Sequence, residues 1–226
     1  MPPRLYSGPL SMFGAKAEIA LHEKGVPFEL VMVPFDMERL YEPKHSEVAR
    51  INPKRQVPVL VDDGVELFDS TQIFEYLEDR WPAPPLWPAG AVARARARQI
   101  EHLSDEVYFP PVIRLMGLQS VPHEPAAVAA RDACAAFYRR LEATLGTSEW
   151  LAGPYTYADI AFFMAQLFGA RMGAPMTEAT PALLAWRARM ADRPAVRRVA
   201  AAMGRYLLSV DRPLPPFLEA MVEADR

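Results

Sequence analysis

Cysteine is scarce in this chain of 226 residues, which contains only Cys134. A single cysteine excludes an internal disulfide, a cysteine-based zinc site and an internal CxxC redox pair. Histidines are also few, and none of them has the i, i+4 or HExxH spacing of a metal site; they are His22, His45, His102 and His123. The sequence therefore predicts neither a disulfide scaffold nor a metal centre.

A strong excess of charge and long apolar runs are missing as well. The 25 basic and 28 acidic residues leave a formal charge of −3, which does not suit a protein that coats nucleic acid or an anionic membrane. No apolar run approaches the roughly 18 residues that span a bilayer. The start, Met1 to Arg4, lacks the basic region and apolar run of a secretory signal. We expect a soluble, cytoplasmic protein with neither nucleic acid nor membrane as partner.

Proline, by contrast, is abundant and concentrated in one place. Of the 23 prolines, four stand between Trp81 and Pro88, where they rule out a helix or a central strand. This segment separates a mixed α/β part from an almost wholly helical part. We therefore expect an α/β domain over residues 1–80, a stiff linker over 81–89 and an all-helical domain over 90–226.

The first part has the pattern β-α-β-α-β-β-α. Its hairpin is the clearest element, because Asp63 and Gly64 supply a turn with positive φ between two apolar strands. The expected elements are strand 4–7, helix 11–24, strand 28–33, a partly helical stretch over 37–50, strands 57–61 and 65–68, and a helix from about 70 to 80.

The second part predicts five helical stretches, over 90–118, 125–145, 157–170, 181–192 and 194–209. Pro110 and Pro111 should break or kink the first of them. Thr156 and Asp159 have the spacing of a capping box at the start of the third. Cys134 lies among alanines and is interpreted as a small core residue. The last fifteen or so residues, with three prolines, suggest an extended tail.

Val57 and Pro58 stand at the head of a strand. Proline there is compatible with ordinary strand punctuation. A cis Val57–Pro58 bond would instead turn the Val57 backbone outward, so that its N–H and C=O could pair with an extended, peptide-like ligand. Both interpretations remain open at this point.

Asp69, Ser70 and Thr71 open a helix directly after a strand. N-capping explains these residue types by itself. The same N–H groups, the positive end of the helix dipole and the Ser70 hydroxyl also suit a carboxylate, and Asp69 suits an ammonium group. Together they match the α-amino acid end of a ligand.

Ser11 stands where the first strand passes into the first helix. It suits a helix N-cap, but a hydroxyl at a helix N-terminus can also donate to a thiolate and lower the pKa of a bound thiol. Ser7 and Tyr6 are alternative donors nearby, although Tyr6 is expected to face the core. Lys44, His45, Arg55 and Gln56 are expected to be solvated, and one or two could hold a second carboxylate.

Taken together, these features resemble the cytosolic glutathione S-transferase family. The resemblance rests on the block Asn52–Leu60 with Gln-Val-Pro, the block Phe68–Leu77 with Asp-Ser, the Trp-Pro linker and the segment Gly153–Ile160. It implies a thioredoxin-like N-terminal domain, an all-α C-terminal domain and a homodimer. Leu5–Ser7 and Ile19–Leu21 are similar to serine-type branches such as zeta and theta.

The resemblance also implies roles for the individual residues. Glutathione would be the co-substrate, paired with the Val57 backbone next to cis-Pro58 and held at its γ-glutamyl end by Asp69 and Ser70. Gln56 and Lys44 would approach the glycine carboxylate, and Ser11 would activate the thiol. A hydrophobic electrophile would lie between the domains against a set of pocket residues, namely Met12, Phe13, Tyr108, Phe109, Arg114 and Met116.

Some positions depart from the family pattern. Met12 replaces a second hydroxyl, Lys16 supplies the usual basic residue, and Arg55 stands where many members have glycine. These departures leave three hypotheses: a transferase, a glutathione-dependent isomerase or dehalogenase, and a non-catalytic member that kept the fold.

Overall fold

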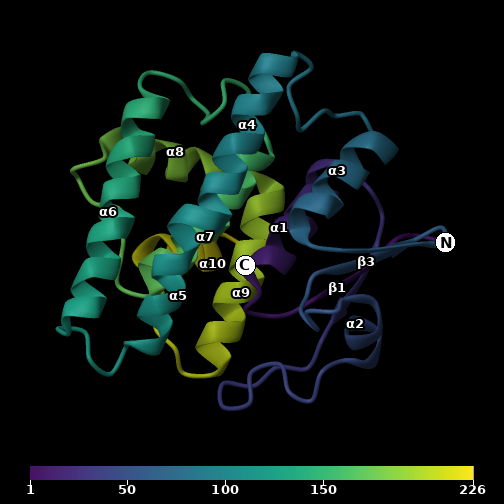
Figure 1. The fold of residues 1–226 in the computed structure, drawn as a ribbon, viewed down its shortest axis with the longest axis horizontal. Helices are drawn as coiled ribbons and strands as arrows, with labels where there is room; N and C mark the ends of the chain where they lie inside the picture. Colours follow the sequence, from purple (N-terminus) through teal and green to yellow (C-terminus); the bar gives the residue numbers. More distant parts are fainter. Residues whose placement is uncertain (226) are drawn as a thin grey trace. The chain divides into compact units, whose positions relative to one another are not determined.

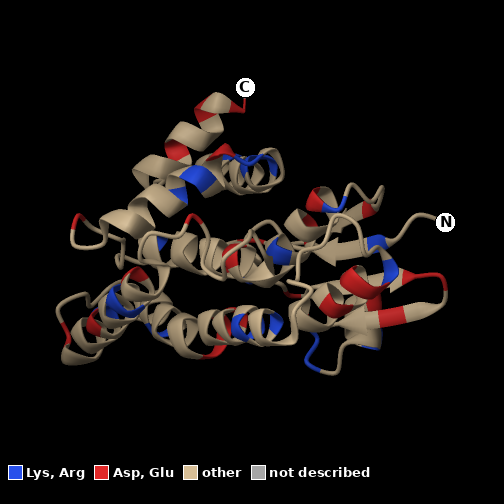
Figure 2. Cartoon of the chain, turned by 90° about the horizontal axis from the view of Figure 1, so that it is seen from above, with Lys and Arg blue, Asp and Glu red and all other residues tan. Residues whose placement is uncertain are grey.

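The computed structural model describes residues 1–225, which form two compact units. The first unit combines residues 1–85 with 194–225, and the second contains residues 86–193. The expected helical domain over 90–226 differs from this division, because the last two helices belong to the first unit. Acidic and basic residues are interspersed along both units (Figure 2). Within residues 1–225 no helix is long and apolar enough to cross a membrane.

The first unit is built on a four-stranded mixed sheet of order β2-β1-β3-β4 (Figure 1). β1 pairs in parallel with β2 and antiparallel with β3, which forms the expected hairpin with β4. Asp63 and Gly64 have φ values of 43° and 82° at the hairpin turn, as their residue types predict. The strands are β1 (Arg4–Ser7), β2 (Glu29–Met32), β3 (Val59–Asp62) and β4 (Val65–Phe68).

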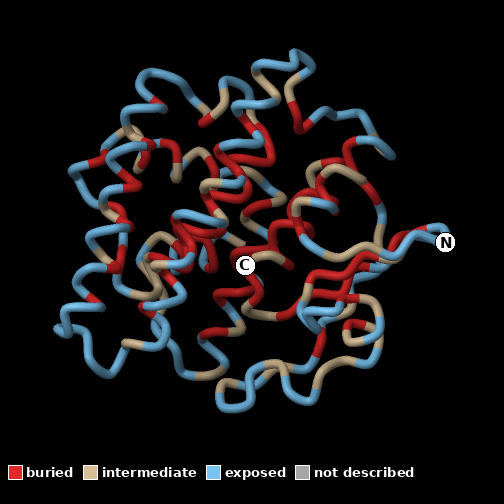
Figure 3. Tube along the Cα trace, in the orientation of Figure 1, coloured by how far each residue is buried: buried red, intermediate tan, exposed pale blue. Residues whose placement is uncertain are grey.

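The middle strands β1 and β3 are mostly buried (Figure 3). Because successive side chains of a strand point to opposite faces, their residues contribute to both layers around the sheet. Tyr6 and Val59 are paired across the strands and belong to a cluster with Val48 of α2 (Ser46–Ile51). Leu5 and Leu60, the next pair, are fully buried and point to the opposite face by the period of two. The core position predicted for Tyr6 is confirmed.

Two further helices complete the expected order of the first 80 residues: α1 (Met12–Glu23) and α3 (Ser70–Arg80), which pack against each other. The end of α1 also holds the proline-rich segment. The buried Lys24 ammonium lies 2.8 Å from a carboxylate oxygen of Glu78 and donates to the carbonyls of Trp81 and Pro84 at 2.8 and 3.0 Å. These contacts explain why a proline-rich stretch is a fixed part of the unit.

Residues 216–224 are helical, so the expectation of an extended tail is wrong for the part of the tail that the structure describes. α10 (Pro216–Ala224) packs on α9 (Pro194–Ser209), which in turn packs on α1 (Figure 1). Pro216 occupies the first turn of α10, where its missing N–H is not needed. Leu218, Met221 and Val222 are buried at helical spacing. Gly204 of α9 allows this approach, because a Cβ there would collide with Val222.

The second unit is wholly helical, and its helices begin and end close to the predicted positions. Pro110 and Pro111 lie in the first turn of α5, directly after a short π-helix, so the predicted interruption is confirmed. α7 is buried along most of its length and forms the core of this unit. The elements are α4 (Ala91–Leu103), η1 (Ser104–Tyr108), α5 (Phe109–Gly117), α6 (Pro125–Leu145), α7 (Tyr157–Arg171) and α8 (Pro181–Asp192).

Candidate functional site

Three of the predicted site segments meet at one edge of the sheet. Tyr6, Val59 and Phe68 stand opposite one another across β1, β3 and β4. β1 therefore ends, β3 begins and β4 ends at the same edge. The adjoining residues carry the predicted chemistry: Ser11 follows β1, Val57–Pro58 precedes β3, and Asp69–Ser70 follows β4. The topology thus brings together a hydroxyl, an exposed backbone segment and a helix N-terminus.

Ser11 caps α1 in a geometry that leaves its proton available. The residue has extended backbone dihedrals, and its Oγ accepts a hydrogen bond from the Gly14 N–H at 2.9 Å. A serine hydroxyl has one donor and two acceptor sites, so this bond does not use the O–H. Ser11 therefore caps the helix and can still donate a hydrogen bond.

Gly14 keeps space open beside two serines. A Cβ built on Gly14 would lie 3.0 Å from the Ser11 Oγ and still closer to the Ser7 Oγ. Ser7 is buried, and its hydroxyl has no hydrogen-bond partner within residues 1–225. Both hydroxyls thus converge on the first turn of α1, which keeps Ser7 as the alternative donor.

The Val57 backbone is free. The Val57–Pro58 bond is cis, as are Glu42–Pro43 and Ala83–Pro84. Neither the N–H nor the C=O of Val57 forms a hydrogen bond with any residue from 1 to 225. The preceding loop is held by the buried Asn52, whose amide donates to the Gln56 carbonyl at 2.6 Å and whose side-chain oxygen accepts from the Lys54 N–H at 2.9 Å. A fixed loop therefore presents the unpaired N–H and C=O groups of Val57.

Arg55 has a left-handed backbone in this loop, with φ of 55°. That conformation costs a residue with a Cβ about 1–2 kcal/mol and is free of this cost in glycine. We expect Arg55→Gly to raise the free energy of unfolding by at most about 1 kcal/mol, because glycine also has greater freedom in the unfolded chain. Arg55→Val should lower it by about 1–2 kcal/mol in urea unfolding. Equal stability of the two variants would contradict this account.

Asp69 and Ser70 form the N-terminus of α3. The Asp69 carboxylate is exposed and accepts from the N–H groups of Thr71 and Gln72 at 3.0 and 3.4 Å. Ser70 is buried, and its own N–H and hydroxyl have no partner among the described residues. Capping is thus confirmed for Asp69, while Ser70 keeps the two donors that a bound carboxylate would need.

The two residues predicted for the second carboxylate lie on the loops around α2. Gln56 is exposed, and the Lys44 ammonium lies 3.2 Å from Glu42. His45 caps α2, with its Nδ1 accepting from the Glu47 N–H at 3.3 Å, and its ring contacts Tyr6. Lys44 therefore has a carboxylate partner already, and an incoming anion would compete with Glu42 for it.

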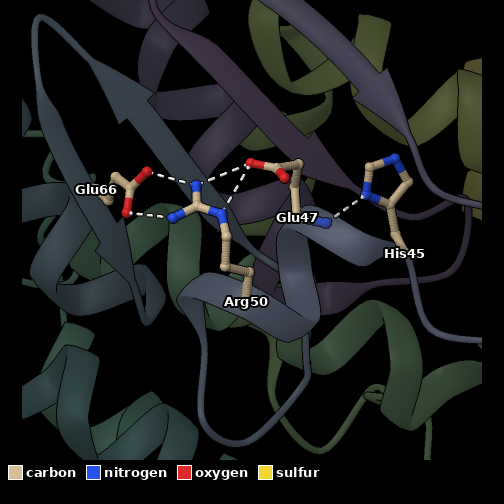
Figure 4. A network of polar contacts seen from close by, with 4 residues as sticks. All are labelled: His45, Glu47, Arg50 and Glu66. Carbon is tan, nitrogen blue, oxygen red and sulfur yellow. Dashed lines mark hydrogen bonds and ion pairs between the residues drawn. The ribbon is translucent and has the colours of Figure 1, made fainter.

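A charge network ties α2 to the sheet (Figure 4). Arg50 on α2 donates to Glu47 one turn earlier and to Glu66 on β4. The hydrogen bonds from Arg50 lower the pKa of both carboxyl groups, and those carboxylates raise the pKa of Arg50. All three side chains are solvated, so the network orients α2 and adds little stability.

The predicted pocket residues fall in both units. In the first unit, Met12 is buried and Phe13 is half-buried, directly after Ser11. In the second unit, Phe109 is buried, while Arg114 and Met116 are exposed. Tyr108 is fully buried among Phe137, Tyr138 and Phe162, with its hydroxyl against that of Tyr138. The structure therefore gives Tyr108 a packing role inside the helical unit.

Glu18 is a feature that the sequence analysis missed. It lies on α1 with 6% of its surface exposed and, together with Ser7, lines a cavity of about 50 Å³. Burial raises its pKa to about 7, although Arg198 on α9 opposes this shift. The same burial, together with Arg198, lowers the pKa of His22, whose Nε2 is 4.0 Å from Glu18. In the sequence, a buried acid at this position is indicated by one glutamate within the otherwise apolar run 17–21.

Cys134 is fully buried in α6, which confirms its packing role, and burial raises the pKa of its thiol to about 11. Such a thiol stays protonated at neutral pH. Residues 1–225 contain no group of three or more His, Cys, Asp or Glu side chains that could hold a metal ion.

Comparison with known proteins agrees with this architecture. Residues 10–80 match the family model of the glutathione S-transferase N-terminal domain, and residues 106–194 match that of the C-terminal domain. A probable glutathione S-transferase of Oryza sativa subsp. indica, GSTU1, is 33% identical over 197 residues, covering 80% of this chain and 81% of that protein. The chain belongs to the glutathione S-transferase family, with a thioredoxin-like N-terminal domain and a helical C-terminal domain.

The chain is also similar to a second sequence relative and to a solved structure. A stringent starvation protein A homolog of Coxiella burnetii is 36% identical over 105 residues, which cover 46% of this chain and 47% of that protein. The match thus spans about half the length of that relative. A glutathione transferase family member from Pseudomonas fluorescens Pf-5, solved with two glutathione molecules bound, shares the fold with a TM-score of 0.75 at 24% identity and covers 88% and 92% of the two chains.

Proposed function

We propose that this protein is a glutathione transferase that binds glutathione at the sheet edge and activates its thiol through Ser11. The observation that carries the proposal is the Ser11 geometry: its Oγ accepts from Gly14 and leaves the O–H free at the N-terminus of α1. The related structure with glutathione bound supports glutathione as the co-substrate. The serine-type chemistry follows from the residue at this cap.

The binding part of the proposal uses unpaired backbone and side-chain groups. Val57 offers an N–H and a C=O, and the cysteinyl part of glutathione is a peptide unit that can pair with both. Ser70 offers an N–H and a hydroxyl to the γ-glutamyl carboxylate, and the exposed Asp69 carboxylate suits the ammonium group. Gln56 and Lys44 would take the glycine carboxylate.

The chemical part follows from the energy of one hydrogen bond. A free thiol has a pKa of about 8.5 and is mostly protonated at neutral pH. A hydrogen bond to a charged group contributes about 1.5–3 kcal/mol, and each pKa unit corresponds to about 1.4 kcal/mol. One bond from Ser11 therefore lowers the thiol pKa by about one to two units. The thiolate attacks an electrophilic carbon of a hydrophobic small molecule, and the leaving group departs with the bonding electrons.

The proposal also covers the residues that contact the electrophile, the oligomeric state, the cellular role and the alternative reactions. The electrophile would contact Met12 and Phe13, which adjoin Ser11, with Phe109, Arg114 and Met116 as further candidates. We also propose a homodimer in the cytoplasm that is active in detoxification, as expected from the family. The same thiolate would serve isomerisation or dehalogenation if the substrate allowed it.

Replacing Ser11 tests the mechanism. We expect Ser11→Ala to lower kcat/KM with a model electrophile by about 10–100-fold, because the thiolate loses one charge-assisted hydrogen bond. The affinity for glutathione, measured by calorimetry, should stay within about twofold, since Val57 and Ser70 are unchanged. Ser11→Thr keeps both the cap and the hydroxyl and should retain most activity.

Ser7→Ala is the matched control, because the Ser7 hydroxyl is nearby, buried and unpartnered. It should bind glutathione and turn over like the unmodified protein. Loss of turnover in Ser7→Ala but not in Ser11→Ala would assign the hydroxyl role to Ser7 and contradict our proposal.

A second candidate is a glutathione-binding protein without turnover. Met12 in place of a hydroxyl and the similarity to a protein named for stringent starvation favour it. Thiolate absorbance on glutathione binding, combined with no turnover over a panel of electrophiles, would support this candidate. Absence of glutathione binding would contradict both.

A further inference from the structure

The cavity beside Glu18 lies in the first unit, where α9 packs on α1 (Figure 1). It has a volume of about 50 Å³, and α9, the end of β2 and the loop after β1 give it a mostly apolar lining. Among the described residues that line it, only Ser7 and Glu18 have polar side chains. Both are more than nine-tenths buried, with 1% and 6% of their surface exposed. The cavity therefore joins two buried polar groups inside an apolar wall.

These two groups lack hydrogen-bond partners within residues 1–225. The Ser7 Oγ has none, and the Glu18 carboxyl group makes no hydrogen bond, since the His22 Nε2 at 4.0 Å is too far away for one. Buried polar groups are almost always hydrogen-bonded, and internal water serves where a polar site has room for it. One water molecule needs roughly 10–15 Å³, so the cavity can hold water that bonds to both side chains.

The charges that face Glu18 come from two helices. Arg198 on α9 lowers the pKa of Glu18, and His22 lies one turn later on α1. The other residues that line the cavity, on the loop after β1, β2 and α9, have no ionisable side chain. Burial outweighs Arg198 and raises the pKa of Glu18 to about 7. The other buried charged residues of the segment 16–24 contact α3 instead, namely Lys16 against Phe74 and Lys24 against Glu78.

The wall of the cavity includes the loop that leads to Ser11. Gly8 and Pro9 line the cavity, and the Gly8 carbonyl accepts from the Ser11 N–H at 3.0 Å. The hydroxyls of Ser7 and Ser11 both lie beside Gly14, where a Cβ would contact them. A change in the hydrogen bonding of Ser7 therefore acts on a short, tight segment that ends at Ser11.

We propose that Ser7 and Glu18 hold internal water in this cavity, and that Glu18 acts through this water and Ser7 as a positioning residue for the loop 7–11. The inference rests on the proposed role of Ser11. A neutral Glu18 can donate its O–H to the water, whereas an ionised Glu18 only accepts. Ionisation therefore draws the water and the Ser7 O–H toward the carboxylate and moves the loop with them. The Ser11 hydroxyl is then displaced from the thiol, and small displacements of a reacting group cost rate.

A high-resolution crystal structure of the full chain at pH 6 tests the water site without glutathione. We expect water within about 3.2 Å of the Ser7 Oγ and of a Glu18 carboxyl oxygen, either as one molecule or as a hydrogen-bonded chain. A cavity without water density, or a Ser7 hydroxyl bonded to a protein group, would overturn the proposal.

The backbone amide signals of Gly8, Leu10 and Ser11 report the positioning by NMR, and they require neither glutathione nor turnover. We expect these signals to follow one titration with a midpoint near pH 7, the pKa of Glu18. Glu18→Gln should abolish this titration, and Ser7→Ala should remove most of it, because the link from Glu18 to the loop is then cut. Loop signals that titrate alike in all three proteins would overturn the proposal.

Two charge variants separate ionisation of Glu18 from a merely structural role. Arg198→Gln should move the midpoint of the loop titration to higher pH, because Arg198 lowers the pKa of Glu18. His22→Gln is the matched control on α1: burial lowers the pKa of His22 below 6.5, so its removal should leave the midpoint near pH 7 in place. A midpoint that follows His22 and not Arg198 would assign the titration to His22 and contradict our inference.

The pH profile of kcat/KM links the site to the proposed function. We expect Glu18→Gln to match the unmodified protein at pH 6 and to exceed it by about threefold at pH 8.5, since only an ionised Glu18 displaces Ser11. A ratio of the two proteins that is the same at every pH would contradict the positioning role. Full activity of Ser11→Ala would refute the proposed function, whereas the amide titration would still decide this inference, so the two fail separately.

Discussion

Asp159→Ala is expected to lower the free energy of unfolding of the helical unit by about 4 kcal/mol. One carboxylate oxygen accepts from the Leu151 N–H at 3.0 Å and the Trp186 indole N–H at 2.9 Å. The other accepts from the Thr156 N–H and hydroxyl at 2.9 and 3.2 Å. Asp159 is fully buried, so alanine leaves these donors without partners and out of reach of water.

This carboxylate also completes the predicted capping box. Thr156 caps α7 and accepts from the Ala158 N–H, while Asp159 at the third helical position accepts from the Thr156 N–H. The same residue holds the loop before α7 and the indole of α8, which the spacing of the capping box alone did not predict. Its loss should therefore disturb three elements at once.

Urea unfolding followed by tryptophan fluorescence measures this effect. Asp159→Asn retains an acceptor for one pair of donors and opposes the other with an NH2 group, so it should lose roughly half as much. Asp132→Ala, on the exposed side of α6, is the control and should change stability by less than about 0.5 kcal/mol. A loss below about 1 kcal/mol in Asp159→Ala would contradict the role of Asp159 in holding these three elements together.

Glu18→Gln is expected to stabilise the protein by about 3 kcal/mol at pH 8. Burial on α1 raises the pKa of Glu18 from 4.5 to about 7. Above that pH the buried side chain is ionised, and its charge destabilises the folded state. Arg198 on α9 lowers the pKa but only partly offsets the burial. Glutamine has nearly the same shape and carries no charge to desolvate.

The pH dependence has a definite sign. A raised folded-state pKa means that Glu18 contributes its full stability below the unfolded value of 4.5 and loses it as pH rises to about 7. The advantage of Glu18→Gln should therefore shrink to below about 1 kcal/mol near pH 5. His22 acts in the opposite sense: burial lowers its pKa below 6.5, so protonation on acidification is disfavoured in the folded state.

Denaturant midpoints across pH 5 to 8 distinguish these two groups. Glu18→Gln should flatten the loss of stability toward pH 8, whereas His22→Gln should flatten the loss below pH 6.5. Glu38→Gln is the control, because Glu38 is exposed in the same unit. A constant offset of Glu18→Gln at every pH would show that packing, and not ionisation, sets its effect.

Local sequence signals predicted most of the fold because each depends on neighbours in the chain. The Asp63–Gly64 turn, the capping residues Ser11 and Thr156 and the interruption at Pro110 follow from backbone preferences that act within a few residues. The tail was mispredicted because Pro215 and Pro216 suggest extended chain locally. What makes α10 helical is burial against Gly204 on α9, a contact that no local pattern contains.

The candidate site residues also fall into two groups: those that local sequence indicates and those that depend on tertiary structure. Ser11, Val57 and Ser70 are predicted site residues because their residue types at strand and helix ends have chemical meaning alone, and the strand register brings them to one edge of the sheet. Glu18 was not identified, since its pKa depends on how deeply α1 is covered by other elements.

The single cysteine shows what the sequence by itself determined. One thiol excludes an internal disulfide and an internal CxxC pair at any geometry, but the sequence alone leaves open whether Cys134 itself can react. Tertiary structure decided what no composition could: that Cys134 is buried with a raised pKa, that Ser11 keeps a free donor, and that the Val57 peptide group stays unpaired. Burial and hydrogen-bond satisfaction arise between distant segments, and only the folded chain sets them.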